Sequence, residues 1–266
     1  MKPIQLSSLV DGERPWSVFS EVEEILRAMP PAGEVGSLRQ TFEDVLDLFD
    51  GRYAGYRACT LEYHNLKHTT DTFLAMARMI HGASLSGSTL PAADVTLGLI
   101  VSLLHDTGYI QAEDDRDGTG AKYTRTHIER SGHFMKDYFA RRGVPAQEFE
   151  AAEAILRCTG LTVRIQDIRF SSPAIDLLGR MLGAADLLGQ MSDRAYLEKL
   201  PFLYYEFQEG AIPGYANELE LLQKTIGFYG MTRKRMAEEL GSVDRFLRPH
   251  FLARWNIDRD LYAESI

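Results

Sequence analysis

The amino-acid sequence predicts an all-α protein. Apolar residues recur at helical spacing along most of the 266 residues, no alternating pattern of useful strand length appears, and the segments between helical patterns are short. The composition, 45% hydrophobic and 25% charged, is that of a globular chain able to bury a sizeable core. No repeat or low-complexity linker divides the chain, so we expect a single domain over residues 1–266.

Five helices are expected in the first 142 residues. The ranges with apolar residues at helical spacing are 16–29, 37–49, 65–80, 91–106 and 125–142. Ser37 is a suitable N-cap because its hydroxyl can accept a hydrogen bond from the first turn. Pro91 suits a helix start, where its missing N–H costs nothing, and Gly143 suits a helix end.

Six further helices are expected in the rest of the chain. Their ranges are 145–159, 172–191, 192–210, 216–229, 231–240 and 242–249. Ser172 precedes a proline and Ser192 begins the next pattern, so both are expected to cap helices. Pro201 is expected to kink its helix. The two segments expected to be loops are 82–90 and 110–121.

Charge and hydropathy exclude several classes of protein. The net charge of −9 and the pI of about 5.3 disfavour nonspecific binding to nucleic acid, whose phosphates would be repelled. The N-terminus lacks an apolar signal core, and the apolar run 95–104 is about half as long as a membrane span. Cys59 and Cys158 form no CxxC pair and are interpreted as reduced thiols. We therefore expect a cytoplasmic protein with no membrane partner.

The segment TLEYHNLKHTTDT, residues 60–72, contains two histidines four residues apart and an acid three residues later. In a helix, His64, His68 and Asp71 would share one face. That arrangement is typical of a metal or acid–base site, but a chance pair of histidines would look the same.

Two acids in apolar helical segments narrow the choice. Asp106 follows His105 at the end of the most apolar helix, and Asp186 lies inside MLGAADLLGQM. A carboxylate buried without a partner is costly, so each needs a compensating charge. Asp186 could pair with Arg180 or Arg194. A metal ion shared with the histidines explains both acids at once.

Three motifs in order resemble the HD-domain metal-dependent phosphohydrolases. YHNLKHTTD, from Tyr63 to Asp71, is similar to the Tyr-His-Asn-x-x-His-x-x-Asp motif of the class I cyclic-nucleotide phosphodiesterases in that superfamily. LLHDTGY resembles its His-Asp motif, and AADLLGQM resembles its late Ala-Asp motif. The resemblance covers roughly residues 60–190. It implies a multi-helix bundle with the metal site in its centre and helical extensions packed on this core.

The resemblance also implies roles for individual residues. It makes His68, His105, Asp106 and Asp186 ligands of a first metal, and Asp106 a bridge to a second. His64 becomes the general acid that protonates the leaving oxygen, while a metal-activated water is the nucleophile. Imidazole and carboxylate ligands suit Mn, Fe, Ni, Zn and, less well, Mg, so one or two such divalent ions are expected per chain.

Other residues have weaker assignments. Asn65 and Asp71 would orient the two histidines. His127 is either a ligand of a second metal or of phosphate, or a helix-surface histidine. Lys67 either touches a substrate phosphate or is a solvated lysine. The remaining histidines, which are expected to be structural or exposed, are His81, His133 and His250.

Two departures concern the substrate. The family continues with a further histidine after His-Asp, whereas this chain reads HDTGYIQ. Its purine-clamping Gln-x-Gly-Phe is replaced by a glutamine, Gln223, four residues before Gly227. We therefore expect hydrolysis of a phosphoester in a small nucleotide-like substrate without assigning a cyclic nucleotide.

Alternative functions and the oligomeric state stay open at this point. The alternatives are a nucleotide phosphomonoesterase or alarmone hydrolase, a non-catalytic module that binds metal or ligand, and an oxygenase with a di-iron centre on the same fold. A homodimer is one of the oligomeric states open to the chain.

Overall fold

The computed structural model describes residues 4–29 and 35–266 and is helical throughout, as the sequence predicts. No strand occurs in these residues; one isolated β-bridge joins Tyr56 to Ala112. The α-helices are α1 (Pro15–Arg27), α2 (Val35–Phe49), α3 (Leu66–Leu85), α4 (Ala92–Leu104), α5 (His127–Arg141), α6 (Ala146–Leu156), α7 (Pro173–Met191), α8 (Tyr196–Glu209), α9 (Glu218–Glu238), α10 (Leu247–Trp255) and α11 (Leu261–Ser265). Six short 3-10 helices, η1 to η6, connect them.

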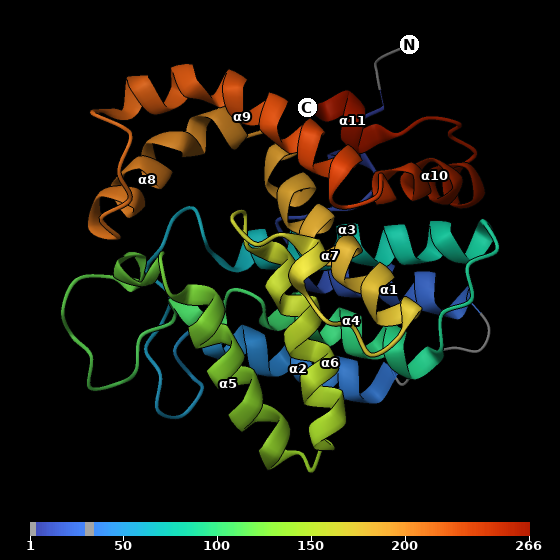
Figure 1. The fold of residues 1–266 in the computed structure, drawn as a ribbon, viewed down its shortest axis with the longest axis horizontal. Helices are drawn as coiled ribbons and strands as arrows, with labels where there is room; N and C mark the ends of the chain where they lie inside the picture. The colour runs from blue at the N-terminus through green and yellow to red at the C-terminus, as the bar shows by residue number, and fades with distance from the viewer. Residues whose placement is uncertain (1–3, 30–34) are drawn as a thin grey trace.

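Helix α3 is the centre of the bundle. Most of its residues are buried, and it packs against α1, α4, α7 and α10 (Figure 1). Its closest neighbour is α7, which approaches at Gly189: a Cβ atom there would lie 3.1 Å from the backbone nitrogen of Thr72. This close contact brings two helices that are far apart in sequence into register, and both supply residues to the site described below.

Some helix boundaries differ from those expected. The two helices expected over 216–229 and 231–240 are one helix, α9 (Glu218–Glu238), because Gly230 lies in it without breaking it. Pro201 lies inside α8, which continues to Glu209. The last expected helix, 242–249, is a 3-10 turn followed by α10, and α11 was not expected.

The capping predictions were partly wrong. Ser172 accepts a hydrogen bond from the backbone N–H of Ile175 and caps α7, and Gly143 has the left-handed φ of 68° expected after α5. Ser37 lies within the first turn of α2, and Ser192 ends α7 instead of starting α8.

The described part of the chain contains no helix that is long and apolar enough to cross a bilayer. The apolar run at 95–104 lies in α4, where most side chains are buried against the bundle. Residues 1–3 of the N-terminal segment lie outside the described residues.

Candidate metal centre

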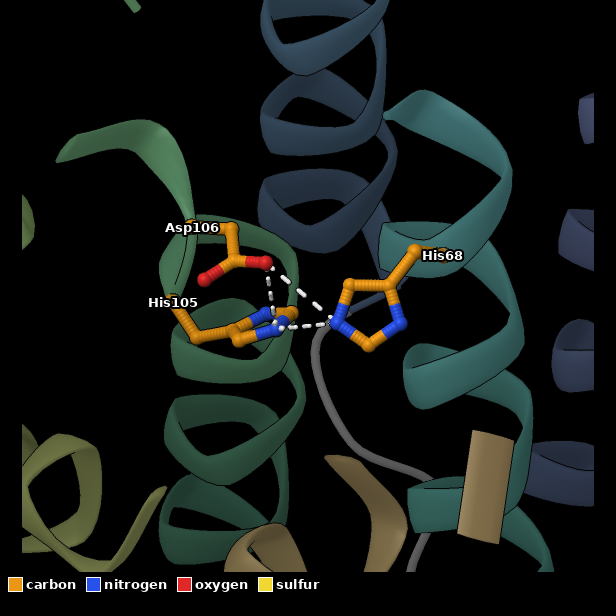
Figure 2. A group of neighbouring side chains, drawn as sticks. All are labelled: His68, His105 and Asp106. Atoms are coloured by element: carbon orange, nitrogen blue, oxygen red, sulfur yellow. Dashed lines mark hydrogen bonds and ion pairs between the residues drawn. The ribbon is translucent and has the colours of Figure 1, made fainter. Parts of the chain in front are cut away.

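Three helices bring four of the predicted ligands together. His68 is in the first turns of α3, His105 ends α4 and Asp106 follows it, and Asp186 is in α7. Figure 2 shows that the rings of His68 and His105 point toward each other and toward the carboxylate of Asp106. These three buried residues could hold a metal ion.

The separations between ligand atoms fit one ion. The Nε2 atom of His68 lies 3.3 Å from that of His105, 3.3 Å from Oδ2 of Asp106 and 3.1 Å from Oδ1 of Asp186. The Nε2 atom of His105 lies 3.4 and 3.7 Å from the same two oxygens. Ligands about 2.1 Å from one ion are about 3.0 Å apart in octahedral and about 3.4 Å apart in tetrahedral coordination. Arg180, one of the two arginines considered as partners of Asp186, pairs with Asp176 instead.

Two buried atoms of this group lack hydrogen-bond partners. They are Oδ2 of Asp106, although it faces both imidazoles, and Nδ1 of His68. A carboxylate oxygen that is withdrawn from water without a hydrogen bond is costly. A divalent cation between Asp106 and the two imidazoles would compensate it, so the donor set fits a metal ion.

The charges around His68 also call for a cation. Burial disfavours protonation of His68, but the carboxylates of Asp106 and Asp186 outweigh it and raise the pKa of His68 to about 10. Burial likewise opposes ionisation of Asp106, yet His105 and His68 hold the pKa of that carboxyl well below its usual value. Without a metal ion, a proton on the imidazole of His68 therefore supplies the positive charge that balances the carboxylates of Asp106 and Asp186.

The tautomer of His105 is fixed by the backbone. Its Nδ1 donates to the carbonyl oxygen of Ser102 at 2.8 Å, which leaves the lone pair on Nε2, the atom that faces the cluster. His127 repeats this arrangement, with Nδ1 donating to the carbonyl of Thr124 at 2.7 Å. Such bonds commonly orient metal-binding histidines.

Asp106 has a histidine on each side. Its Oδ2 faces His68 and His105, while its Oδ1 lies 3.9 Å from Nε2 of His127. Burial lowers the pKa of His127, so this imidazole is neutral and can donate a lone pair. The structure thus places the half-buried imidazole of His127 beside the second oxygen of Asp106.

The turn after Asp106 positions His127. Gly108 donates its N–H to the hydroxyl of Ser131 at 2.8 Å, and the guanidinium of Arg130 donates to the carbonyls of Gly108 and Ile110. A Cβ atom on Gly108 would lie 1.9 Å from the carbonyl oxygen of His127. Only glycine lets the turn lie this close to the start of α5.

His64 stands beside the cluster and has a different partner. Its Nδ1 lies 2.6 Å from Oε2 of Glu206, a buried residue of α8. The other oxygen of Glu206 accepts the backbone N–H of Tyr63 at 2.8 Å. The His64 ring is 5.9 Å from that of His68, centroid to centroid, and its Nδ1 is taken by Glu206 rather than by any of the four predicted ligands.

An aromatic ring separates His64 from His127. Tyr109 stacks on His64 at 4.5 Å and on His127 at 4.6 Å between ring centroids, with interplanar angles of 16° in both cases. In the family that the motifs resemble, a further histidine follows the His-Asp pair. The corresponding residue here is Tyr109, whose ring lies between His64 and His127.

Asp186 is held by its own helix. Gln190, one turn later, donates to the backbone carbonyl of Asp186 at 3.1 Å and to its Oδ1 at 3.5 Å. The side-chain oxygen Oε1 of Gln190 in turn accepts a hydrogen bond from the hydroxyl of Tyr63 at 2.7 Å. Tyr63 therefore contacts the partners of both His64 and Asp186.

Asn65 and Asp71 were expected to orient the two imidazoles, but both have other partners. Asn65 is the N-cap of α3: its Oδ1 accepts the backbone N–H of His68 at 3.2 Å, so it fixes the helix rather than a ring. Asp71 accepts a hydrogen bond from Lys67 at 2.6 Å. Lys67 also lies 3.6 Å from Asp193 and 3.9 Å from Glu13, so its charge is already balanced by acids.

The three other histidines lie elsewhere. His81 and His250 are buried and face each other, with 2.8 Å between their Nδ1 atoms, and His133 is exposed on α5. These positions agree with the structural or surface roles expected for them.

The sequence analysis missed Glu206 and Gln190. The apolar context FLYYEF could have identified Glu206, because an acid in a buried-looking helix raises the same question as Asp186. Gln190 is four residues after Asp186, where side chains share a helix face. Their partners, however, come from segments distant in sequence.

Residues 112–239 match a protein-family model described as Npun_R2479-like. This match covers slightly less than half of the chain and includes His127, Asp186 and Glu206, but it begins after His64, His68 and His105. No curated protein and no solved structure matches the chain. The comparisons name no activity and do not include the HD-domain family that the motifs resemble, so function has to be argued from the site.

Proposed function

We propose that the protein is a metal-dependent phosphohydrolase that cleaves a phosphoester bond of a small nucleotide-like substrate. The observation that carries the proposal is the pairing of two separate groups: a buried cluster of His68, His105 and Asp106 joined by the half-buried Asp186, and a neighbouring imidazole, His64, oriented by Glu206. A structural metal site needs only the first group. The resemblance to HD-domain phosphohydrolases supports the same assignment.

The first ion would be held by His68, His105, Asp106 and Asp186. A bound divalent ion would polarise a phosphoryl oxygen and lower the pKa of a coordinated water. His105 enters the site with its tautomer already fixed, and Gln190 restrains Asp186. The donor set of nitrogen and oxygen suits Mn, Fe, Ni, Zn and, less well, Mg.

A second ion is supported by the two sides of Asp106. Its oxygens face different histidines, with His68 and His105 on one side and His127 on the other. We propose Asp106 as the bridging carboxylate and His127 as a ligand of the second ion.

His64 is assigned the proton transfer. When Nδ1 of His64 donates to Glu206, a protonated ring carries its other proton on Nε2, where it can be given to the leaving oxygen. Glu206 fixes the plane of the ring, and Tyr109 stacks on its face. His64 thus acts by donating a proton.

The charge of the substrate phosphate would be met by ions and imidazoles rather than by Lys67. Lys67 is committed to Asp71, Asp193 and Glu13. A contact of Lys67 with substrate phosphate is not proposed here for that reason.

The test is metal content and turnover measured together. The protein is loaded separately with Mn, Fe, Ni, Zn or Mg and incubated with cyclic nucleotides, nucleoside monophosphates, dinucleotides and bis(p-nitrophenyl) phosphate, and products are followed by chromatography. We expect hydrolysis with at least one metal, abolished by Asp186→Ala and unaffected by His133→Ala, a change of an exposed histidine. One or more ions bound per chain without turnover of any substrate would contradict the proposal and favour the non-catalytic module.

A further inference from the structure

Helix α9 carries an apolar stripe that faces away from the protein. Leu219, Leu222 and Ile226 are 60, 41 and 79% exposed. They are three and four residues apart and therefore lie on one side of the helix. The residues of α9 that are buried against the protein are Leu221, Thr225, Thr232, Arg235 and Met236. In Figure 1, α9 runs along the upper edge of the molecule. A continuous exposed apolar stripe is typical of an interaction surface.

Two glycines in α9 have no role in packing the single chain. A Cβ atom on Gly227 or Gly230 would meet nothing within 4 Å. Glycine inside a helix costs about 1 kcal/mol relative to alanine. Gly230 lies on the apolar stripe, one turn after Ile226, while Gly227 points about a quarter turn away. The absence of a side chain at position 230 lets another backbone come close.

Charge is divided along the same helix. Its first turn contains Glu218 and Glu220, of which Glu220 pairs with Lys224, and its last turns contain Arg233, Lys234 and Arg235, followed by Glu238. Within the ranges that the structure describes, Arg233 has no ionic partner, and Lys234 reaches only an exposed glutamate at 3.8 Å. Two copies of α9 packed antiparallel would place the acidic end of each beside the basic end of the other.

We propose that α9 is the interface of a twofold-symmetric homodimer in which the α9 helices of two copies pack antiparallel. With Ile226 on the twofold axis, Leu222 packs over Gly230 of the partner subunit. Leu219 then lies along the aliphatic part of Arg233 of the partner subunit, and Glu218, on the same side of the contact, faces the guanidinium of Arg233 of the partner subunit. With the axis at Ile226, residues 218–234 of the two copies overlap, which gives a contact about 26 Å long. Such self-complementarity is what a twofold interface requires.

The first experiment measures mass in solution against concentration, by light scattering and sedimentation. We expect the full-length protein to be a dimer at micromolar concentrations and Ile226→Glu to be a monomer with unchanged helicity. Leu252→Glu is the matched control, because Leu252 is 45% exposed but lies on α10. A wild-type monomer at 100-fold higher concentration, or a dimer that survives Ile226→Glu, would overturn the proposal.

The second experiment tests the antiparallel direction by disulfide formation. Ile226→Cys should link two chains under mild oxidation, because the position faces its own copy across the axis. Leu219→Cys should not link, since the two copies would be about 21 Å apart along the helices. Burial raises the pKa of Cys59 to about 11 and of Cys158 to about 12, so the native thiols react slowly, and the wild type is the control. Linking of Leu219→Cys as readily as Ile226→Cys would contradict the antiparallel arrangement.

The glycines provide a third test. Gly230→Gln should raise the dimer dissociation constant at least tenfold, while Gly227→Gln should leave it within twofold. Both changes should preserve or raise the melting temperature of the monomeric Ile226→Glu background, because neither side chain meets the rest of the chain there. A Gly230→Gln dimer as tight as the wild type would contradict this packing.

Discussion

His64 and His68 are the same side chain four residues apart, but His64 precedes α3 whereas His68 lies in its first turn, and their partners distinguish them. His68 faces Asp106 and Asp186, whereas His64 faces Glu206 and stacks on Tyr109. The carboxylate of Glu206 holds Nδ1 of His64 and orients its ring, while two carboxylates and a second imidazole around Nε2 of His68 suit a metal ion. The single residue therefore has its function set by what surrounds it.

Removing each imidazole should give a different defect. His68→Ala should lose the metal and lower the melting temperature, because His105, Asp106 and Asp186 are left as buried groups without compensation. His64→Ala should keep the metal while turnover falls about 10²- to 10⁴-fold, with a smaller loss for a nitrophenolate leaving group that needs no proton. Elemental analysis beside kinetics on a poor and a good leaving group checks this. If His64→Ala loses the metal, His64 is a ligand and the proton-donor assignment is wrong.

Glu206 can be tested with an isosteric change. Glu206→Gln retains an oxygen that can accept the N–H of Tyr63 but removes the charge beside His64. We expect full metal content and turnover reduced about 10- to 100-fold, the usual effect of losing a partner that orients a catalytic group. Glu209→Gln, an exposed acid one turn later on α8, is the control; unchanged turnover for Glu206→Gln would refute its role.

At the scale of elements, the turn between α4 and α5 determines where His127 lies relative to Asp106. The turn crosses the start of α5 at Gly108, and hydrogen bonds from Gly108 and Arg130 hold the two segments together. The contact sets the distance between His127 and Asp106. A change in the packing of this turn should therefore move His127 in the candidate metal site.

A methyl group at position 108 should disrupt this contact. In Gly108→Ala the new Cβ would lie 1.9 Å from the carbonyl oxygen of His127 and 2.7 Å from the nitrogen of Ser131, so backbone has to move. We expect a loss of about 1–3 kcal/mol in the free energy of unfolding and a weaker second metal. Gly132→Ala is the matched control: its Cβ would meet only Leu156, at 3.8 Å, and should be neutral or stabilising. Denaturant unfolding with metal titration checks both; equal stability would exclude the close contact.

The helices themselves were largely predictable, because apolar periodicity and caps act over a few residues. The continuous helix α9 was not predictable, because two helices were expected at 216–229 and 231–240 and glycine is only a weak helix breaker. The last turns of α9 are also anchored by hydrogen bonds from Arg235 to backbone carbonyls of residues 158–163. The three site motifs identified the residues that converge. The partners Glu206 and Gln190 required tertiary structure, because a side chain's hydrogen bonds depend on which helix packs beside it.

At the scale of the whole molecule, the chain has more acidic than basic residues, and the candidate site itself contains two carboxylates, Asp106 and Asp186. The protein has a net charge of −9, and the cluster adds no basic side chain other than imidazole. Protonation of His68 and binding of a cation are therefore alternative ways to balance the site. This competition makes stability and metal affinity depend on pH in a defined direction.

The metal-free protein should lose stability as pH rises. The pKa of His68, opposed by burial but raised by Asp106 and Asp186, is about 10 in the folded protein, compared with about 6.5 in an unfolded chain. The stabilisation is thus complete below about pH 6.5 and is lost between there and about pH 10. The metal-loaded protein should not show this loss, and metal affinity should rise with pH over the same range, because binding displaces a proton. Thermal melts with and without chelator check this; parallel pH profiles for both forms would refute it.

The two oxygens of Glu206 connect α8 to the segment where the metal-binding motif begins. One accepts the N–H of Tyr63 and the other faces His64, across more than 140 residues of sequence. Thermodynamic linkage makes this connection reciprocal: a substrate analogue that binds the protein more tightly when His64 is in place must strengthen the docking of α8 by the same free energy. Occupancy of the site should therefore slow amide hydrogen exchange in α8, and Glu206→Gln should remove this effect while the exchange rates in α1 stay the same.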